Sequence, residues 1–471
     1  MQAKIFFGSQ EVIKENFSQR KNPFSGKVVS QAPICDAEDA RKALKIAQEA
    51  TQDAKTSTLS QRCNWLLDVA KKLRENKEDI AKTITDEVGK PITFARVEVE
   101  RCIETVLLSA ETMRTMHGET INTDAMGSGK KTIAYFSRIP AGVVVAITPF
   151  NFPLNLIAHK LAPALVAGNT VVLKPTPEAP LTAYKFAKLF IESEYAIKDA
   201  LSVVYGDSEV GNALITSDIP RVISFTGSVP VGNIITKNAG IKKVSLELGG
   251  NAATFVDKSA DLDLAARRCA LGAFINSGQV CISLQRIYVD SAIYEEFAQK
   301  MAEETQKLVV GSPYEDATFM GPLIDDEASI RAMEWVQSAI TEGAIALLPP
   351  RREGRMFYPC VMANVTDEMA IVCQEVFAPI VSLVRVNDFD EAVPKMNNSP
   401  YGLQFSVFTN DLNLAKRAID VLDAGGIVIN DMPTLRFDIQ PYGGVKLSGV
   451  GREGPRFAIE EMTEIKSVVI C

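Results

Sequence analysis

Residues 141–175 read AGVVVAITPFNFPLNLIAHKLAPALVAGNTVVLKP and contain the pattern that identifies the fold class. The run AGVVVAIT is continuously apolar and rich in β-branched residues, which is typical of a strand buried on both faces of a sheet. The stretch LNLIAHKLAPALVAG then has helical spacing, and TVVLKP is again strand-like. A buried strand, a helix and a second buried strand form a βαβ unit, so we expect a parallel sheet here.

The alternation of strands and helices continues along the chain in two series. The first adds a helix near 180–194 and the strand-like runs LSVVYG, RVISFTGS and KVSLELGG. The second begins near Thr254 and contains ATFVD, RIYVD, PIVSLVRV, QFSVFTN and GGIVIN, with helices through 261–276 and 292–308. Both series predict an α/β protein with two doubly wound domains, each built on its own sheet.

Three segments depart from this alternation. Residues 36–118 have helical spacing, with Asp36 as a candidate N-cap and a break at Gly89–Pro91. Residues 119–138 are polar with strand-like ends, and the C-terminal IEEMTEIKSVVI also ends in a strand-like run. These strand-like ends have no evident place in either predicted sheet.

Size and charge limit the classes of function. The chain has 471 residues, and a prior of about 150 residues per domain suggests about three domains or sub-domains. Its formal charge is −8, without a long run of either sign, which argues against nucleic-acid binding. No apolar segment reaches the roughly 20 residues of a membrane span, and the first residues show no signal peptide. We therefore expect a cytoplasmic protein without nucleic-acid or membrane partners.

Cysteines and histidines are sparse. The eight cysteines are scattered without a CxxC pair, so neither a zinc ribbon nor a disulfide framework is indicated. His117 and His159 are the only histidines, which excludes an HExxH zinc site and any cluster of three histidines. We expect no metal. If the protein is an enzyme, its general base should be a carboxylate or a lysine.

One motif has dinucleotide-loop spacing without the matching context. Gly449, Gly451 and Gly454 form a literal GxGxxG that follows Lys446-Leu-Ser close to the C-terminus. A dinucleotide fingerprint should follow a strand and open a helix inside a βαβ unit. We interpret this segment as a tight, mobile glycine loop.

Two residues suggest nucleophile and base chemistry. Cys281 lies in NSGQVCISLQR among small residues that leave a thiol accessible, although most free cysteines are small buried hydrophobes. Glu247 ends the strand of KVSLELGG, where parallel sheets bind ligands. Burial there would raise the pKa of its carboxyl and suit it to general-base catalysis; a capped or salt-bridged acid is the alternative.

Three further elements follow buried strands. Asn151 in ITPFNFPL is a candidate donor to an oxyanion, or else a turn or N-cap residue. Lys174 in TVVLKP is a candidate ligand of phosphate or ribose, or else a solvated strand-end lysine. The segment from Gly227 to Gly232 follows a strand and opens a helix, which offers N–H groups to a phosphate.

Taken together, these stretches closely resemble the aldehyde dehydrogenase superfamily. The matching motifs are TPFNFPL, VVLKP, FTGSVPVG, LELGG, GQVC, EVFAPI at 375–380 and PYGGVKLSGVGREG at 441–454. The resemblance covers the chain from about residue 20. It implies NAD(P)-dependent, non-acylating oxidation of an aldehyde to its carboxylic acid through a cysteine thiohemiacetal and thioester.

The resemblance assigns roles to individual residues. It implies that the Cys281 thiolate attacks the aldehyde, that Asn151 and the Cys281 backbone N–H hold the oxyanion, and that Glu247 activates the hydrolytic water. It also implies a set of cofactor-binding residues, in which Lys174 and Glu375 hold the riboses, Ser228 faces the pyrophosphate and Phe377 packs near the nicotinamide ribose. The full set is Thr148, Pro149, Lys174, Gly227, Ser228, Gly232, Leu248, Glu375 and Phe377.

The resemblance also implies a domain organisation. The dinucleotide-binding domain would comprise residues 1–118 and 140–248, and the catalytic domain residues 249–450. Residues 119–139 and 451–471 would form a small β arm that pairs across subunits, which would account for the unplaced strand-like ends. A homodimer or homotetramer is expected.

Two features of the sequence concern the branch within the family. A branch that transfers the acyl group to coenzyme A often lacks the glutamate of LELGG, so the presence of Glu247 favours hydrolysis. NAD-preferring members commonly have a glutamate three residues after the lysine of the KP motif, whereas this chain has Pro177 there and Glu178 one place further on. NAD is slightly favoured over NADP.

The motifs resemble most a subgroup of lactaldehyde, phosphonoacetaldehyde and non-phosphorylating glyceraldehyde-3-phosphate dehydrogenases. Members that use phosphate or phosphonate have an arginine just before the catalytic cysteine, where this chain has Val280, and Phe152 follows Asn151. A small hydroxyaldehyde such as lactaldehyde or glycolaldehyde is therefore favoured. Arg101 and Arg436 provide the alternative, a clamp for an anionic aldehyde such as succinate semialdehyde, sulfolactaldehyde or glyceraldehyde-3-phosphate. Otherwise Arg101 is an exposed helix arginine and Arg436 forms a salt bridge within its loop.

A hypothesis from another class is a non-catalytic scaffold of the same fold. The intact set of Cys281, Glu247, Asn151 and Lys174 argues against it, because a scaffold does not need them. Ester hydrolysis or acyl transfer through Cys281 alone is a third possibility.

Overall fold

The computed structural model describes residues 1–471. The larger of its two main sheets has eight strands. The strands lie in the order β2-β1-β9-β8-β7-β10-β11-β23. They are β1 (Ile5–Phe7), β2 (Gln10–Val12), β7 (Val143–Ile147), β8 (Thr170–Lys174), β9 (Leu201–Val203), β10 (Val222–Thr226), β11 (Lys243–Glu247) and β23 (Gly449–Val450). The five central strands β7–β11 are parallel. The predicted βαβ unit of residues 141–175 is the centre of this sheet.

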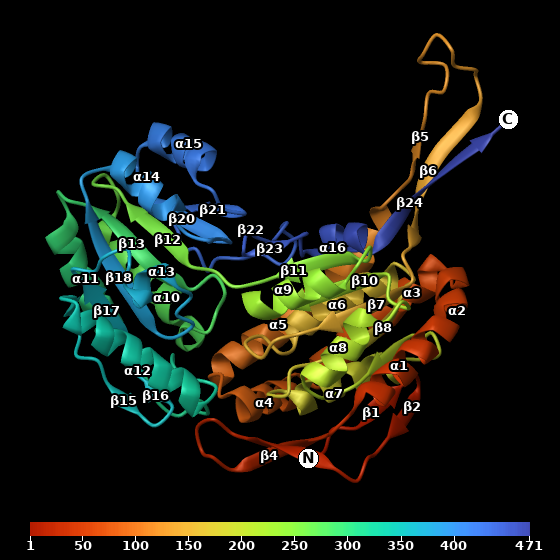
Figure 1. The fold of residues 1–471 in the computed structure, drawn as a ribbon, viewed down its shortest axis with the longest axis horizontal. Helices are drawn as coiled ribbons and strands as arrows, with labels where there is room; N and C mark the ends of the chain where they lie inside the picture. The colour runs from red at the N-terminus through yellow and green to blue at the C-terminus, as the bar shows by residue number, and fades with distance from the viewer.

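Helices cover both faces of the first sheet (Figure 1). They are α1 (Ala37–Glu49), α2 (Thr51–Thr56), α3 (Leu59–Glu75), α4 (Lys77–Val88), α5 (Ile92–Thr115), α6 (Asn155–Val166), α7 (Pro180–Ile191), α8 (Ser208–Thr216) and α9 (Val229–Asn238). Helix α6 is buried on all sides because α5 packs over it. Asp36 caps α1 through its side chain, as the sequence predicts.

The second sheet has seven strands in the order β14-β17-β18-β13-β12-β20-β21. They are β12 (Ala252–Val256), β13 (Leu284–Asp290), β14 (Ile345–Ala346), β17 (Cys360–Ala363), β18 (Ile380–Val386), β20 (Gln404–Phe408) and β21 (Gly426–Ile429). The covering helices are α10 (Leu262–Phe274), α11 (Tyr294–Gln306), α12 (Asp326–Thr341), α13 (Ala370–Cys373), α14 (Phe389–Asn397) and α15 (Leu412–Val421). Val256 and Phe408 face the α10 and α11 core, whereas the preceding residues, Phe255 and Val407, face α14 and α15. This alternation is the two-residue period of a sheet covered on both faces.

A three-stranded arm projects from the body (Figure 1). It consists of β5 (Glu119–Thr120), β6 (Ile133–Pro140) and β24 (Thr463–Ile470), in the order β24-β6-β5. Eight residues of β24 pair antiparallel with β6. The strand-like ends that had no place in the sequence pattern therefore meet in one sheet, and the expected fold of two α/β domains with a small β arm is confirmed.

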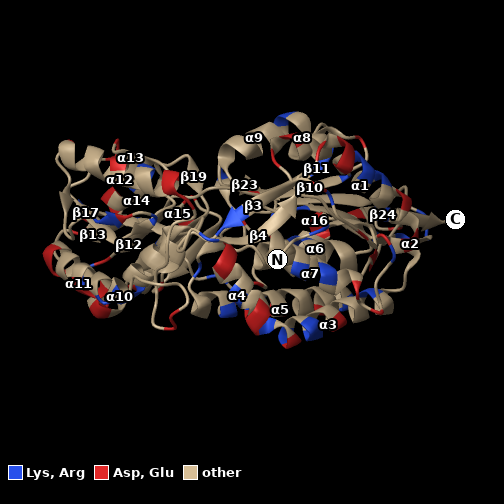
Figure 2. Ribbon diagram, turned by 90° about the horizontal axis from the view of Figure 1, so that it is seen from below, with Lys and Arg blue, Asp and Glu red and all other residues tan.

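The remaining strands form two-stranded ladders at the periphery. They are β3 (Phe17–Lys21) with β4 (Val28–Pro33), β15 (Arg352–Glu353) with β16 (Met356–Phe357), and β19 (Tyr401–Gly402) with β22 (Val445–Lys446). Charged side chains of both signs are interspersed over the outer helices (Figure 2). No helix is both long and apolar enough to cross a membrane.

The GxGxxG segment lies at the edge of the first sheet. Its strand β23 pairs antiparallel with β11, and Gly449 has a φ of +147° in close contact with that strand. A side chain at Gly449 would lie 2.0 Å from the Leu246 carbonyl oxygen, so only glycine fits. The segment runs along the sheet edge rather than linking parallel strands, and it leads to Glu453 and helix α16 (Pro455–Glu461).

Candidate active site

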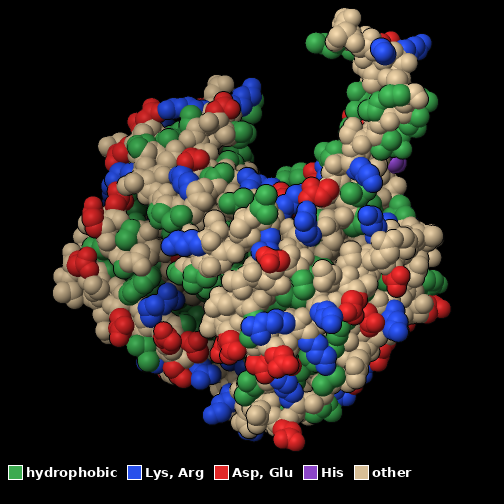
Figure 3. All heavy atoms as spheres, turned by 45° about the vertical axis from the view of Figure 1, so that its right-hand side comes forward, with side chains coloured by type: hydrophobic (Ala, Val, Ile, Leu, Met, Phe, Trp, Pro, Cys, Tyr) green, Lys and Arg blue, Asp and Glu red, His purple; other side chains and the backbone are tan.

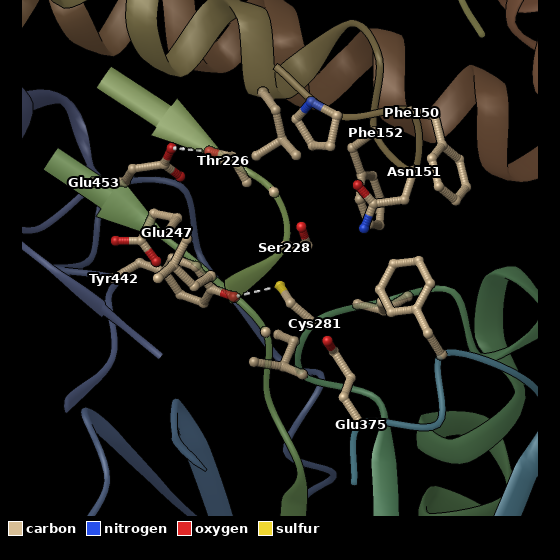
Figure 4. A pocket seen from close by; sticks show the side chains of 18 of the residues that line it. Phe150, Asn151, Phe152, Thr226, Ser228, Glu247, Cys281, Glu375, Tyr442 and Glu453 are labelled. Atoms are coloured by element: carbon tan, nitrogen blue, oxygen red, sulfur yellow. Dashed lines mark hydrogen bonds between the residues drawn. The ribbon is translucent and has the colours of Figure 1, made fainter. Parts of the chain in front are cut away.

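A cavity of about 390 Å³ lies where the two sheets meet, and both halves of the molecule line it (Figure 4). The strand ends place its polar residues: Glu247 ends β11, Asn151 follows β7 and Cys281 precedes β13. Thirteen of the sixteen site residues predicted from the sequence line the cavity, namely Arg101, Pro149, Asn151, Phe152, Gly227, Ser228, Glu247, Leu248, Val280, Cys281, Glu375, Phe377 and Arg436. Thr148, Lys174 and Gly232 lie outside its wall.

Cys281 follows a loop with an unusual backbone. Asn276, Ser277 and Gly278 are all left-handed, with φ values of 50°, 56° and 72°. Contacts with the surrounding chain offset the cost of this conformation: Asn276 donates to the Asn151 carbonyl at 3.3 Å, and Ser277 donates to the Gly321 carbonyl at 2.8 Å. The loop is thereby tied to the turn that contains Asn151.

The Cys281 side chain is half-buried and lies against Tyr442, whose hydroxyl oxygen is 3.0 Å from Sγ. Burial raises the pKa of the Cys281 thiol to about 12, while the Tyr442 hydrogen bond and the charge of Arg436 act to lower it. Val280 beside it packs with Ile282, Leu403 and Tyr442. The wall around the sulfur is therefore apolar, as the absence of an arginine at position 280 implies.

Asn151 lies in a turn that α5 stabilises. Glu98 of α5 accepts hydrogen bonds from the backbone N–H groups of Leu154 and Asn155, at 2.9 and 3.2 Å, and also pairs with the buried Lys90. The carboxylate thus caps the first turn of α6. In Figure 4 the Asn151 side chain extends into the cavity, and its Oδ1 has no partner.

Glu247 is buried and neither of its carboxyl oxygens has a hydrogen-bond partner. Burial raises the pKa of the Glu247 carboxyl well above its ordinary value, and the neighbouring charge of Glu453 raises it further. Glu453 itself pairs with Lys160 at 3.0 Å and with Arg436 at 3.1 Å, which keeps its pKa low. Burial and Glu453 therefore favour the neutral form of the Glu247 carboxyl, whereas Lys160 and Arg436 favour the ionised form of Glu453.

The two arginines of the expected anion clamp already have carboxylate partners. Arg101 donates from Nε and Nη2 to the two oxygens of Asp438, at 2.9 and 2.8 Å. Arg436 bonds Glu453 through Nη2, whereas its buried Nε has no partner. Arg101 is thus engaged in a bidentate ion pair, and Arg436 retains the one free buried donor.

Phe152 lies between cations. Its ring faces the Lys90 ammonium at 3.9 Å and the Arg101 guanidinium carbon at 5.9 Å. Asp438, the partner of Arg101, also accepts from Asn155 and bonds His159 Nε2 at 2.9 Å. These contacts hold Phe152 and Arg101 in place in the wall of the cavity.

The residues present fit a dinucleotide. A side chain at Gly227 would lie 2.4 Å from the Phe225 ring, and the Ser228 N-cap makes no side-chain hydrogen bond to α9. Apart from Pro230, which has no N–H, the first backbone groups of α9 are therefore available to a phosphate. Glu375 accepts from the Gly250 N–H at 3.0 Å, and burial raises the pKa of its carboxyl to about 7.

The cofactor residues outside the cavity wall lie directly behind it. Thr148 donates its backbone N–H to the Lys174 carbonyl, which couples the ends of β7 and β8. Burial lowers the pKa of the Lys174 ammonium, whereas the charges of Glu178 and Asp207 raise it. Gly232 of α9 packs against Leu248, and a side chain there would lie 2.7 Å from the leucine methyls.

Sequence reasoning missed several residues of the site. Tyr442 and Glu453 lie in the motif PYGGVKLSGVGREG, and a search of that motif for polar side chains would have found them. Thr434 also lines the cavity, with a buried hydroxyl that has no partner. Lys160 and His159 lie on the all-round apolar helix α6, where no local pattern distinguishes them from core residues.

Comparisons with known proteins agree with this geometry. Residues 11–468 match the model of the aldehyde dehydrogenase family. The 3-sulfolactaldehyde dehydrogenase of Priestia aryabhattai is 42% identical over 450 residues, which are 95% of this chain and 94% of that protein. The lactaldehyde dehydrogenase of Methanococcus aeolicus is 38% identical over 468 residues, 98% of this chain and 99% of that protein.

A solved structure is similar over the same length. The glyceraldehyde-3-phosphate dehydrogenase GapN of Methanocaldococcus jannaschii, complexed with NADP, superimposes with a TM-score of 0.93 at 38% identity. The match covers 97% of this chain and 100% of that one.

Proposed function

The chain belongs to the aldehyde dehydrogenase family and is an NAD(P)-dependent aldehyde dehydrogenase, and on this basis we propose that Cys281 is its nucleophile. The observation that carries the proposal is that one cavity encloses Cys281, Asn151 and Glu247, whose carboxyl has no hydrogen-bond partner. The cavity continues to the cradle, the turn at Gly227 and Ser228 that fits a dinucleotide phosphate. A thiol that lines a cavity together with an unpaired carboxyl suits two-step acyl chemistry.

In the first step the Cys281 thiolate bonds to the aldehyde carbon. The side-chain amide of Asn151 and the backbone N–H of Cys281 hold the oxygen that becomes negative. A bound nicotinamide would accept the hydride that leaves the former aldehyde carbon, and the acyl group would remain on Cys281 as a thioester. The hydrogen bond from Asn276 to the Asn151 carbonyl links the Asn151 turn to the loop that precedes Cys281, and so fixes the position of the donor relative to the nucleophile.

In the second step Glu247 removes a proton from water, whose oxygen attacks the thioester carbon; the C–S bond breaks, the acid is released and the Cys281 thiolate is regenerated. Its two free oxygens leave it able to accept that proton. Glu453 lies next to it in the same cavity and is held by Lys160 and Arg436. The positive charges of Lys160 and Arg436 act to lower the pKa of the Glu247 carboxyl, and so favour the ionised form that accepts a proton.

The proposed cofactor contacts follow from the cradle. The N–H groups behind Ser228 would hold the pyrophosphate, and Lys174 and Glu375 would bond the two riboses. Phe377, with its left-handed φ of 49°, would pack near the nicotinamide ribose. Thr148, Pro149, Gly227, Gly232 and Leu248 complete the set.

Glu178 supports a preference for NAD. Its carboxylate accepts a hydrogen bond from Thr176 and acts on the Lys174 ammonium, so it lies at the proposed adenosine ribose site. A carboxylate there repels a 2′-phosphate. The ratio of kcat/KM for NAD over NADP should fall in Glu178→Gln if this assignment is right, and an unchanged ratio would remove Glu178 from the selection.

The substrate we propose is a small hydroxyaldehyde such as lactaldehyde or glycolaldehyde. Val280 makes the wall beside Cys281 apolar, and Arg101 is held in its bidentate pair with Asp438. A pocket of paired charges and apolar walls suits hydroxyl groups better than a dianion. The similarity to lactaldehyde dehydrogenase supports this substrate class.

An anionic aldehyde is the second candidate, and one observation favours it. The buried Nε of Arg436 has no partner, and Thr434 on the same loop has an unpaired hydroxyl. A monoanionic substituent could accept from both donors. The similarity to 3-sulfolactaldehyde dehydrogenase supports this alternative.

An aldehyde panel with NAD and NADP in parallel tests these substrates. Lactaldehyde and glycolaldehyde should give higher kcat/KM than succinate semialdehyde, sulfolactaldehyde, glyceraldehyde-3-phosphate and propanal. A preference for an anionic aldehyde that Arg436→Ala abolishes would replace the first candidate by the second. Failure to oxidise any aldehyde with either cofactor would favour a scaffold.

We also propose the organisation of the whole protein. The dinucleotide-binding domain would be residues 1–118 and 140–248, the catalytic domain 249–450, and the oligomerisation arm 119–139 and 451–471. Figure 3 shows hydrophobic side chains gathered on the arm, among them Ile133, Ile465 and Val469, which are more than half exposed. A homodimer or homotetramer in the cytoplasm would cover these residues.

A further inference from the structure

Tyr442 is fixed in place by its backbone and by its ring. Its N–H and C=O pair with Glu453 across the loop, at 3.1 and 2.7 Å. The guanidinium of Arg436 lies 3.7 Å from the ring centre, and the side chains of Val280 and Leu403 pack against the same residue. Tyr442 is only 6% exposed, so its ring has little freedom to turn.

The hydroxyl of Tyr442 has a single hydrogen-bond partner. That partner is the Cys281 sulfur, 3.0 Å away, and Figure 4 shows the two side chains pointing toward each other across the cavity. Burial keeps the pKa of the Tyr442 phenol well above its ordinary value, so the phenol is protonated and can donate. A hydrogen bond from a neutral donor to a thiolate favours the charged form of the sulfur.

The other ionisable groups that act on Cys281 oppose one another. The positive charge of Arg436 favours the thiolate, whereas Glu375 and Glu247 disfavour it when ionised. Arg436 is bound to Glu453 and acts across the Tyr442 ring, while the Tyr442 hydroxyl contacts the sulfur directly. Tyr442 is therefore the one side chain that both touches the sulfur and favours its charged form.

We propose that Tyr442 is a positioning residue for the nucleophile: its O–H donates to the Cys281 thiolate, stabilises that charge and holds Sγ in one orientation within the cavity. This inference rests on the proposed role of Cys281. It adds to that role a group that favours the thiolate form of Cys281, in a chain where neither histidine is hydrogen-bonded to the sulfur.

The test is Tyr442→Phe, which removes one oxygen and keeps the ring. The rate of Cys281 alkylation by iodoacetamide is followed against pH by mass spectrometry of the Cys281 peptide, because the exposed Cys373 and Cys471 also react. The whole rate profile should move to higher pH by roughly one to two units, so that the rate at any pH below the half-point falls roughly ten- to hundred-fold. An unchanged half-point would overturn the proposal.

Tyr288→Phe is the matched control. Tyr288 is fully buried in β13 and bonds Arg286 through its hydroxyl, away from the cavity. Loss of a buried hydroxyl alone should leave the alkylation profile unchanged, and a shift as large as that of Tyr442→Phe would overturn the assignment. Thermal melting checks that both variants fold.

A second readout separates this inference from the proposed function. In Tyr442→Phe the burst of reduced cofactor should slow roughly ten-fold or more near pH 7 and recover at high pH, while KM for the cofactor is unchanged. A slow burst that does not recover at high pH would contradict thiolate stabilisation. An alkylation shift without any aldehyde oxidation by the wild type would support the hydrogen bond and contradict the proposed function alone.

Discussion

At the scale of single residues, a substitution of Cys281 should affect aldehyde oxidation but not cofactor binding. The sulfur lies in the cavity, whereas the cradle at Gly227 and Ser228 belongs to the other half of the molecule. Cys281→Ser should therefore abolish aldehyde oxidation, because a serine hydroxyl is a far weaker nucleophile than a thiolate. Dinucleotide affinity, measured by fluorescence titration, should change by less than a few-fold. Loss of both properties would identify Cys281 as a structural residue.

Glu247 gives a second prediction for a single side chain. Glu247→Gln should retain a burst of one reduced cofactor per active site, while steady-state turnover falls by roughly 10² or more because the base is lost. Rapid-mixing absorbance measures both quantities. Glu49→Gln, on the exposed surface of α1, is the control. Normal steady-state turnover in the Glu247→Gln variant would remove the residue from deacylation.

The raised pKa of Glu247 sets the direction of the pH dependence. Burial favours the protonated carboxyl, and the base form accumulates only as the pH rises toward the raised pKa. Where deacylation limits turnover, kcat of the wild type should therefore increase from neutral to alkaline pH. Glu247→Gln should lose this component of the profile, and a kcat that falls over the same range would contradict the assignment.

Among the helices and strands, a charge on α5 determines where α6 begins. Glu98 pairs with the buried Lys90 and accepts from the first N–H groups of α6, just after the Asn151 turn. Glu98→Gln leaves Lys90 buried without its counter-charge. We expect a loss of about 3–5 kcal/mol in the free energy of unfolding and a lower kcat, because the turn loses its cap.

Urea unfolding followed by circular dichroism measures this loss. The double variant Glu98→Gln/Lys90→Met should recover part of the stability, since it removes both charges together. The lower kcat should persist in the double variant, because Asn151 still lacks the capped turn. Equal stability of the single variant and the wild type would show that the pair does not hold this helix start.

For the molecule as a whole, the arm connects the chain terminus to the body. Strand β24 pairs with β6 along its full length and leaves its other edge free. Deletion of residues 463–471 removes that edge and the exposed apolar side chains Ile465, Val469 and Ile470. The mass of the assembly, measured by analytical ultracentrifugation, should fall toward that of a monomer. An assembly of unchanged mass would place the subunit contact elsewhere.

Local sequence is sufficient to predict the alternation of strands and helices and the position of Cys281, Asn151 and Glu247 near strand ends. These features depend on periodicity and on residue types next to one another, so they can be predicted without the tertiary structure. The local sequence also indicated the arm, because the strand-like ends of residues 119–138 and of the C-terminus fitted neither predicted series of strands.

The pairing of distant side chains, by contrast, follows from the packed structure alone. The sequence suggests Arg101 as a clamp for a substrate anion, yet it bonds Asp438, which lies 337 positions away. Tyr442 is separated from Cys281 by 161 positions and nevertheless contacts its sulfur. Ion pairing and pKa shifts depend on the charges and burial that packing brings together from distant segments, and no local pattern contains that information.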